Sequence, residues 1–145
     1  MMPSNRPRRT LLGVWTLLVC ALLMGLVAGC GAVKKDKRAV TLQNATNGYQ
    51  AALRWGYYDT AYGFVTPEIR DKTPNLPIKP GLRLTGYDVI QQPTMLDGDK
   101  ATQMVAIEYL YEDQQVVKRL MDRQLWHWDE KKQSWWLMTG LPKFE

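Results

Sequence analysis

The chain has few of the residues on which metal and catalytic sites most often depend. Two cysteines and one histidine occur among 145 residues, too few for a His/Cys metal cluster. The acidic residues are scattered rather than gathered at ligand spacing, so an all-carboxylate metal site has no support. No Ser-His-Asp order and no Gly-rich phosphate loop occurs. We therefore predict no metal, no cofactor and no catalytic residue.

The folded part of the chain also lacks an excess of positive charge. The formal net charge is +5, but three arginines precede residue 10 and four basic residues lie between positions 34 and 38. Twelve basic and thirteen acidic residues follow residue 38. A nucleic-acid-binding domain needs a basic face of its own, so we expect no nucleic-acid partner.

The sequence does have one long uncharged stretch near its start. The early arginines precede an apolar run over residues 11–27, which ends in Leu26-Val27-Ala28-Gly29-Cys30. This is the order of an export signal, and the last five residues resemble the lipobox of bacterial lipoproteins. An uncleaved transmembrane helix is the alternative, since about 17–25 apolar residues can span a bilayer. The arginine pair also loosely resembles a twin-arginine signal.

The lipobox resemblance implies that residues 1–29 are removed as a signal peptide and that Cys30 carries diacylglycerol and fatty acids such as palmitate. Cys20 leaves with the leader, so the mature chain forms no internal disulfide. Two or more acyl chains anchor a protein firmly, so the membrane is an expected partner. Glycine rather than aspartate at position 31 favours the outer membrane of the cell envelope, with the protein facing the periplasm.

Residues 30–40 are then a basic tether, followed by one domain over residues 41–145. The tether holds the basic cluster Lys34–Arg38, which includes one acid. Two interpretations stay open. The cluster is attracted to anionic headgroups, at about 1 kcal/mol per residue near such a surface, or it is a solvated spacer.

The first part of the domain has the pattern of helices. Apolar residues recur at intervals of three and four over Thr41–Trp55, and Gly56 marks the end of this helix. Asp59 is expected to cap a second, shorter helix. Thr66-Pro67-Glu68 predicts the start of a third helix, with a threonine cap, a first-turn proline and a first-turn acid. Three prolines then make 72–81 an irregular connection.

After Gly81 the apolar period changes to two, which predicts strands. We expect a bulge or bend at Gly86 and a turn at Asp97-Gly98. The strands are expected over 82–91, 101–111, 116–128 and 135–139. This order is typical of an α+β fold, with two or three N-terminal helices packed on one face of a curved four-stranded antiparallel sheet.

The short turns predict a register in which Glu108 lies opposite Arg119 and Trp128 lies opposite Trp135. The face that should meet the helices then carries Val105, Ile107, Tyr109, Leu120, Trp126, Trp128, Trp135 and Leu137. The other face carries the charged pair and His127, which we expect to be structural. A slip of one residue would exchange the two faces.

This arrangement resembles the NTF2-like superfamily, a cystatin-like α+β cone. Several motifs more narrowly resemble small proteobacterial lipoproteins: Arg54-Trp55-Gly56, Phe64-Val65-Thr66-Pro67-Glu68, Trp126-His127-Trp128-Asp129, and Trp135-Trp136-Leu137 with Gly140-Leu141-Pro142-Lys143-Phe144. The likeness covers most of residues 41–144. It implies fold and location rather than chemistry, because such folds host enzymes, binding modules and assembly proteins.

The NTF2-like resemblance implies a pocket between the sheet and the helices. In the predicted register Asp122 and Gln124 lie on the helix-facing side, beside Tyr109 and Trp126. A polar residue there must be hydrogen-bonded, solvated or functional. Related isomerases and cyclases use an acid and tyrosines in such a pocket, so Asp122 with Tyr109 is the enzymatic candidate. The alternative is that Asp122 pairs with a lysine or a helix residue, or lies near a strand edge.

We expect the tryptophans of the domain, including Trp55, to lie mostly in the core. Trp135 and Trp136 point to opposite faces, and an exposed one beside Leu125 and Met138 would form a partner-binding patch. The leading hypothesis is a non-enzymatic, membrane-tethered module that binds an envelope protein or forms a homodimer. The alternatives are a small-ligand carrier or sensor and an isomerase- or cyclase-like enzyme. A closed cone favours the first hypothesis, and a polar cavity favours the others.

Overall fold

The computed structural model describes the backbone of residues 29–145 and the side chains of residues 37–145. Residues 1–28 of the predicted leader lie outside this described part, and so does the side chain of Cys30. A compact unit extends from Arg38 to Glu145 and so begins before the expected domain start at residue 41. Among the described residues, no helix has both the length and the hydropathy of a bilayer-spanning segment.

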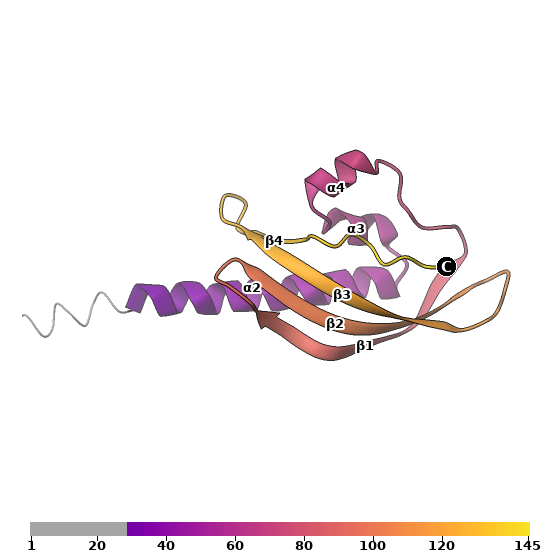
Figure 1. Ribbon diagram of the computed structural model, residues 1–145, viewed down its shortest axis with the longest axis horizontal. Coiled ribbons are helices and arrows are strands. Elements are labelled where there is room, and N and C mark those ends of the chain that lie inside the picture. Colours follow the sequence, from indigo (N-terminus) through magenta and orange to yellow (C-terminus); the bar gives the residue numbers. More distant parts are fainter. Residues whose placement is uncertain (1–28) are drawn as a thin grey trace, which may run out of the picture. The chain divides into compact units, whose positions relative to one another are not determined.

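Helix α2 (Gly29–Arg54) confirms the helix predicted from Thr41 and begins earlier in the chain. Within the compact unit it crosses one face of the sheet (Figure 1). Its buried side chains recur at intervals of three and four, as the apolar pattern predicts: Leu42, Thr46, Tyr49, Ala52 and Leu53. The helix ends in a Schellman motif, in which Gly56 has a φ of +75° and the Tyr57 N–H donates to the Ala52 carbonyl at 2.8 Å.

The expectation that Trp55 is buried is wrong, because its side chain is 76% exposed. The buried stripe of α2 reaches Leu53, and a residue two positions further on points about 200° around the helix axis, away from the sheet. Gly56 follows directly, so Trp55 lies at the surface of the turn into the next helix.

Two short helices follow, α3 (Tyr58–Gly63) and α4 (Pro67–Lys72). The prediction that Asp59 caps the second helix is wrong, because Asp59 lies within the first turn rather than at the N-cap. The helix start predicted at Thr66 is confirmed, although the threonine side chain makes no capping hydrogen bond. The Thr66 N–H instead donates to the Leu137 carbonyl at 3.0 Å, which holds the start of α4 against the last strand.

Four antiparallel strands form one open sheet in chain order: β1 (Leu82–Met95), β2 (Lys100–Tyr111), β3 (Lys118–Asp129) and β4 (Ser134–Leu137). Three helices on one face of this sheet confirm the predicted α+β class (Figure 1). The irregularity expected at Gly86 is also confirmed, because Thr85 has no partner on β2. This extra residue shifts the side-chain alternation of β1, so Leu84 and Tyr87 both pack into the core.

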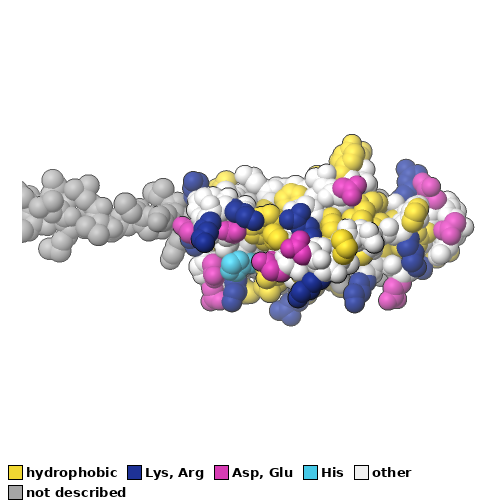
Figure 2. All heavy atoms as spheres, turned by 90° about the horizontal axis from the view of Figure 1, so that it is seen from above, with side chains coloured by type: hydrophobic (Ala, Val, Ile, Leu, Met, Phe, Trp, Pro, Cys, Tyr) yellow, Lys and Arg dark blue, Asp and Glu magenta, His cyan; other side chains and the backbone are white. Residues whose placement is uncertain are grey.

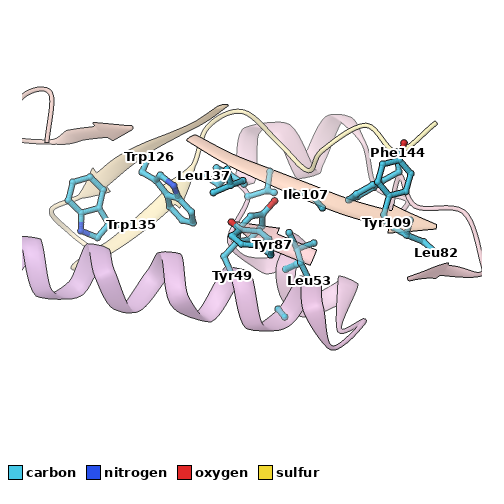
Figure 3. Close-up of a cluster of buried hydrophobic side chains, with 14 of the residues drawn as sticks. Tyr49, Leu53, Leu82, Tyr87, Ile107, Tyr109, Trp126, Trp135, Leu137 and Phe144 are labelled. Carbon is cyan, nitrogen blue, oxygen red and sulfur yellow. The ribbon is translucent and has the colours of Figure 1, made fainter. Parts of the chain in front are cut away.

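The predicted register of the other strands is confirmed. Trp128 lies opposite Trp135, and Glu108 lies opposite Arg119. The helix-facing side carries the expected core (Figure 3), in which the fully buried side chains include Val105, Ile107, Trp126 and Leu137. The Glu108–Arg119 pair is 3.8 Å long and largely exposed, so it contributes little to stability.

Arg38, which the sequence analysis placed in the tether, belongs to the folded unit. Its guanidinium donates to the Gly98 carbonyl at 2.6 Å and to the Glu130 carboxylate. The same group lies 5.4 Å from the ring centroid of Trp128, within the range of a cation–π contact. The Trp135 indole N–H donates to the Arg38 carbonyl at 3.1 Å. One residue thus ties α2 to the β1–β2 turn and to the β3–β4 hairpin.

Candidate functional site

The polar groups expected on the helix-facing side form a closed hydrogen-bonded cluster around Gln124. This side chain is 0% exposed. Its amide nitrogen donates to the Tyr87 hydroxyl and to the Asp122 carboxylate, both at 2.9 Å. Its amide oxygen accepts from the Trp126 indole N–H at 3.3 Å. Both amide hydrogens and the amide oxygen are therefore used inside the protein, which makes Gln124 a positioning residue.

Asp122 reaches this cluster from the neighbouring inward position of β3. Burial raises the pKa of its carboxyl group, and the hydrogen bond from Gln124 opposes that rise. Its hydrogen-bond partner is Gln124, and no described cation forms an ion pair with it. Asp122 is therefore an inward-facing acid whose charge is not balanced by a neighbouring base among the described residues. Of the alternatives for Asp122, pairing with a lysine is thus not found.

Two tyrosines that the sequence analysis did not select complete the cluster. Tyr49 on α2 is 0% exposed, and its hydroxyl has no hydrogen-bond partner among the described residues. Burial raises the pKa of both Tyr49 and Tyr87, and the charge of Asp122 acts in the same direction on each. Both phenols are therefore neutral at physiological pH. Tyr49 also packs edge-on against Trp126, with ring centroids 5.7 Å apart.

Tyr109, the predicted partner of Asp122, lies elsewhere. It pairs with Lys118 in the sheet, four residues from Asp122 along β3, or about 13 Å. Its hydroxyl exchanges hydrogen bonds with the backbone of Glu145, each at 3.2 Å, and its ring packs against Phe144 at 5.0 Å. Figure 3 shows this pair well away from Trp126. The structure therefore brings together Asp122, Gln124 and Trp126, without Tyr109.

Three cavities lie outside this cluster, and none of them is lined by a cluster residue. The first, of about 510 Å³, lies between the start of α4 and the β3–β4 turn. The second, of about 400 Å³, lies between α4 and the chain after Gly140. The third, of about 340 Å³, lies between α2 and β4. The cluster residues therefore do not line any of these three spaces, and Asp122 is half-buried.

Neither Trp135 nor Trp136 is exposed, so the tryptophan-centred binding patch expected there is not found. Trp135 is buried, and Trp136 is half-buried on the opposite face. The Trp136 ring lies 4.8 Å from the Lys132 ammonium and 5.7 Å from the Arg70 guanidinium carbon. These contacts are cation–π interactions that occupy the indole. Met138 beside it is exposed.

The largest exposed aromatic side chains flank Gly56 instead. Trp55 is 76% exposed and Tyr57 is 65% exposed. The next residue along holds this turn against β1, because the Tyr58 hydroxyl donates to the Leu82 carbonyl at 2.8 Å. Since Leu82 lies opposite the last residue of β2, the turn is at the end of the sheet that carries the β2–β3 hairpin. We call this end the aromatic end.

Charge does not single out a site on the face drawn in Figure 2. Basic and acidic side chains are mixed across this view, with hydrophobic side chains exposed between them. His127 lies on the sheet face away from the helices, where its Nε2 is 3.3 Å from the Asp99 carboxylate. In the described part of the chain no three His, Cys, Asp or Glu side chains are grouped as metal ligands would be.

Comparison with known proteins does not assign the chain to a family. No protein-family model matches the chain, and no curated protein matches it. The lipoprotein and NTF2-like resemblances therefore stay predictions, and function has to be argued from the residues themselves.

Proposed function

We propose that the protein is a lipoprotein of the cell envelope, anchored through Cys30 and facing the periplasm, whose compact unit is a non-enzymatic binding module. The lipobox-like motif Leu26–Cys30 supports the anchor. Three helices on one face of a curved four-stranded sheet support the NTF2-like relationship that belongs to the same proposal. The outer membrane is the favoured location because position 31 is glycine.

The observation that carries the binding role is the exposure of Trp55 and Tyr57 on an ordered turn. Tryptophan and tyrosine are enriched among the residues that dominate binding energy at protein interfaces. Each buries about 150–250 Å² when covered, which at about 25 cal/mol per Å² corresponds to several kcal/mol. The Schellman motif and the Tyr58 hydrogen bond fix the turn, so little further ordering is needed on binding.

The packing around Gln124 supports the same conclusion. A site for substrate needs polar groups directed into a space that the substrate can enter. Here the amide of Gln124 is saturated by protein groups, and Trp126 fills the position beside it. We expect the partner to be a protein of the envelope or a second copy of this chain.

The test is photocrosslinking in the native cell envelope. A photoreactive residue replaces Trp55 or Tyr57, and the control replaces Asp88, which is exposed on the opposite face of the sheet. We expect one discrete adduct from the first two positions and none from the third. An adduct of twice the monomer mass would identify a homodimer. Equal crosslinking at all three positions, or none at any, would contradict the proposal.

A carrier or isomerase-like role is the second candidate, and the inward-facing Asp122 favours it. Its raised pKa and its two tyrosine neighbours are features of acid–base sites. Native mass spectrometry of the detergent-extracted protein separates the candidates. A co-purifying small molecule that Asp122→Asn releases would support the carrier. Retention of that molecule with loss of its turnover would support the enzyme.

A further inference from the structure

Two of the three hairpin turns lie at one end of the sheet, because neighbouring strands run in opposite directions (Figure 1). One turn covers residues 96–99 between β1 and β2, and the other covers residues 130–133 between β3 and β4. Arg38 holds both turns to α2 through the Gly98 carbonyl and the Glu130 carboxylate. We call this surface the Arg38 end. It is opposite the aromatic end.

The Arg38 end is close to Cys30 along the chain. Only residues 31–37 separate the two. Eight Cα–Cα steps span about 28 Å at most when fully extended, and about 12 Å in a helix. The sheet itself is longer, because the 12 residues of β2 extend for about 40 Å. A lipid on Cys30 therefore brings the Arg38 end, rather than the aromatic end, nearest to the bilayer.

The side chains of the Arg38 end suit the boundary between lipid headgroups and acyl chains. Met95 and Leu96 project where β1 enters its turn, and Leu96 is 54% exposed. Exposed apolar side chains at such a tip bind a bilayer by burying their surface below the headgroups.

The charges at this end balance one another. The basic side chains are Arg38, Lys100, Lys131 and Lys132, and the acidic ones are Asp97, Asp99, Asp129 and Glu130. Several of the acids are engaged: Glu130 contacts Arg38, and Asp99 contacts His127. The Asp129 carboxylate accepts two backbone N–H groups of its own turn. Attraction of these side chains to anionic lipid is therefore weak, and the apolar tip has to supply the contact between the two turns and the bilayer.

From this arrangement we propose that the Arg38 end is the membrane-facing surface of the unit. Met95 and Leu96 lie among the lipid headgroups, and Trp55 and Tyr57 point away from the bilayer toward the partner. The proposal rests on the proposed lipidation of Cys30 and adds the orientation that the lipid alone does not give.

Depth-dependent quenching tests the orientation. Cys20 is removed with the leader and Cys30 carries the lipid, so an introduced cysteine is the only free thiol of the mature lipidated protein. Leu96→Cys and the matched control Val117→Cys, on the opposite β2–β3 turn and 57% exposed, are labelled with an environment-sensitive fluorophore. The lipidated protein is placed in phosphatidylcholine–phosphatidylglycerol vesicles that contain brominated lipid. We expect severalfold stronger quenching at position 96 than at position 117, with little change between low and high salt.

The outcomes separate the two proposals. Equal quenching at the two positions, stronger quenching at position 117, or no quenching at either would overturn the orientation in a protein that carries the acyl mass. Mass spectrometry of the N-terminal peptide reports that acyl mass independently. An unmodified Cys30 in protein from the native host would overturn the anchor, and the orientation with it.

Discussion

Replacing Tyr49 by phenylalanine is expected to stabilise the protein. The Tyr49 side chain is 0% exposed, and its hydroxyl has no hydrogen-bond partner among the described residues. Phenylalanine keeps the ring that packs edge-on against Trp126 and Phe64, with centroids 5.7 Å and 6.0 Å away. The substitution therefore removes a desolvated polar atom and leaves the aromatic contacts in place.

The size of the effect follows from the cost of a buried polar group without a partner, about 1–3 kcal/mol. Loss of the hydroxyl also removes a few dispersion contacts and leaves a space smaller than a methyl group, which offsets part of the gain. We expect a net gain of about 1 kcal/mol in the free energy of unfolding. For a domain of roughly 100 residues this raises the melting temperature by about 4 °C.

Thermal and urea unfolding of the leaderless Cys30→Ser protein, followed by near-UV circular dichroism, measure this change. Tyr58→Phe is the matched control, because the Tyr58 hydroxyl donates to the Leu82 carbonyl at 2.8 Å. Its loss should destabilise by about 1 kcal/mol, so the two substitutions should have opposite signs. A loss of stability in both would refute the reasoning. It would mean that the Tyr49 hydroxyl has a partner such as a bound water or ligand, which would favour the carrier role.

Four further substitutions have defined outcomes. Burial raises the pKa of Asp122 in the folded state, so folding favours the neutral acid. The contribution of this group to the free energy of unfolding is fully present below the ordinary aspartate pKa of about 4, and it is lost as the pH rises through the raised pKa. Urea titrations should therefore find Asp122→Asn more stable than the parent at neutral pH, with a difference that shrinks at low pH. Arg38→Ala should lower the free energy of unfolding by about 1–2 kcal/mol by urea titration, and Glu130→Gln should lower it by less than about 0.5 kcal/mol, because that carboxylate is largely exposed. Cys30→Ser in the native host should leave the precursor uncleaved and without lipid label; normal processing would refute the lipobox assignment.

The sequence was most informative where a short turn joined two strands of clear alternation. The register of β2, β3 and β4 was predicted because one polar turn separates each pair, so the offset had little freedom. The helix end at Gly56 was predicted for a similar local reason, since glycine readily takes the left-handed backbone found at helix ends. In both cases the deciding interaction lies within a few residues along the chain.

The sequence was least informative where a local irregularity changes which face a side chain occupies. A bulge or bend was predicted at Gly86, and the position of the extra residue decides whether Tyr87 faces the core or the solvent. With Thr85 as the extra residue, Tyr87 faces inward and meets Gln124. The candidate site was therefore assigned Tyr109, which lies on a strand whose register was fixed, and not Tyr87.

Arg38 shows why composition alone misplaced the start of the domain. It follows three lysines closely, so proximity in sequence assigned it to the basic tether. Its contacts are with Gly98 and Glu130, which are 60 and 92 residues away, and no local pattern reports such pairs. Because these contacts occupy the Arg38 guanidinium, only three lysines and one acid remain in the segment before the domain. The smaller net charge weakens the attraction of this segment to anionic headgroups. The lipid and the apolar tip at Leu96 would then have to hold the unit at the membrane, and the quenching experiment measures that difference.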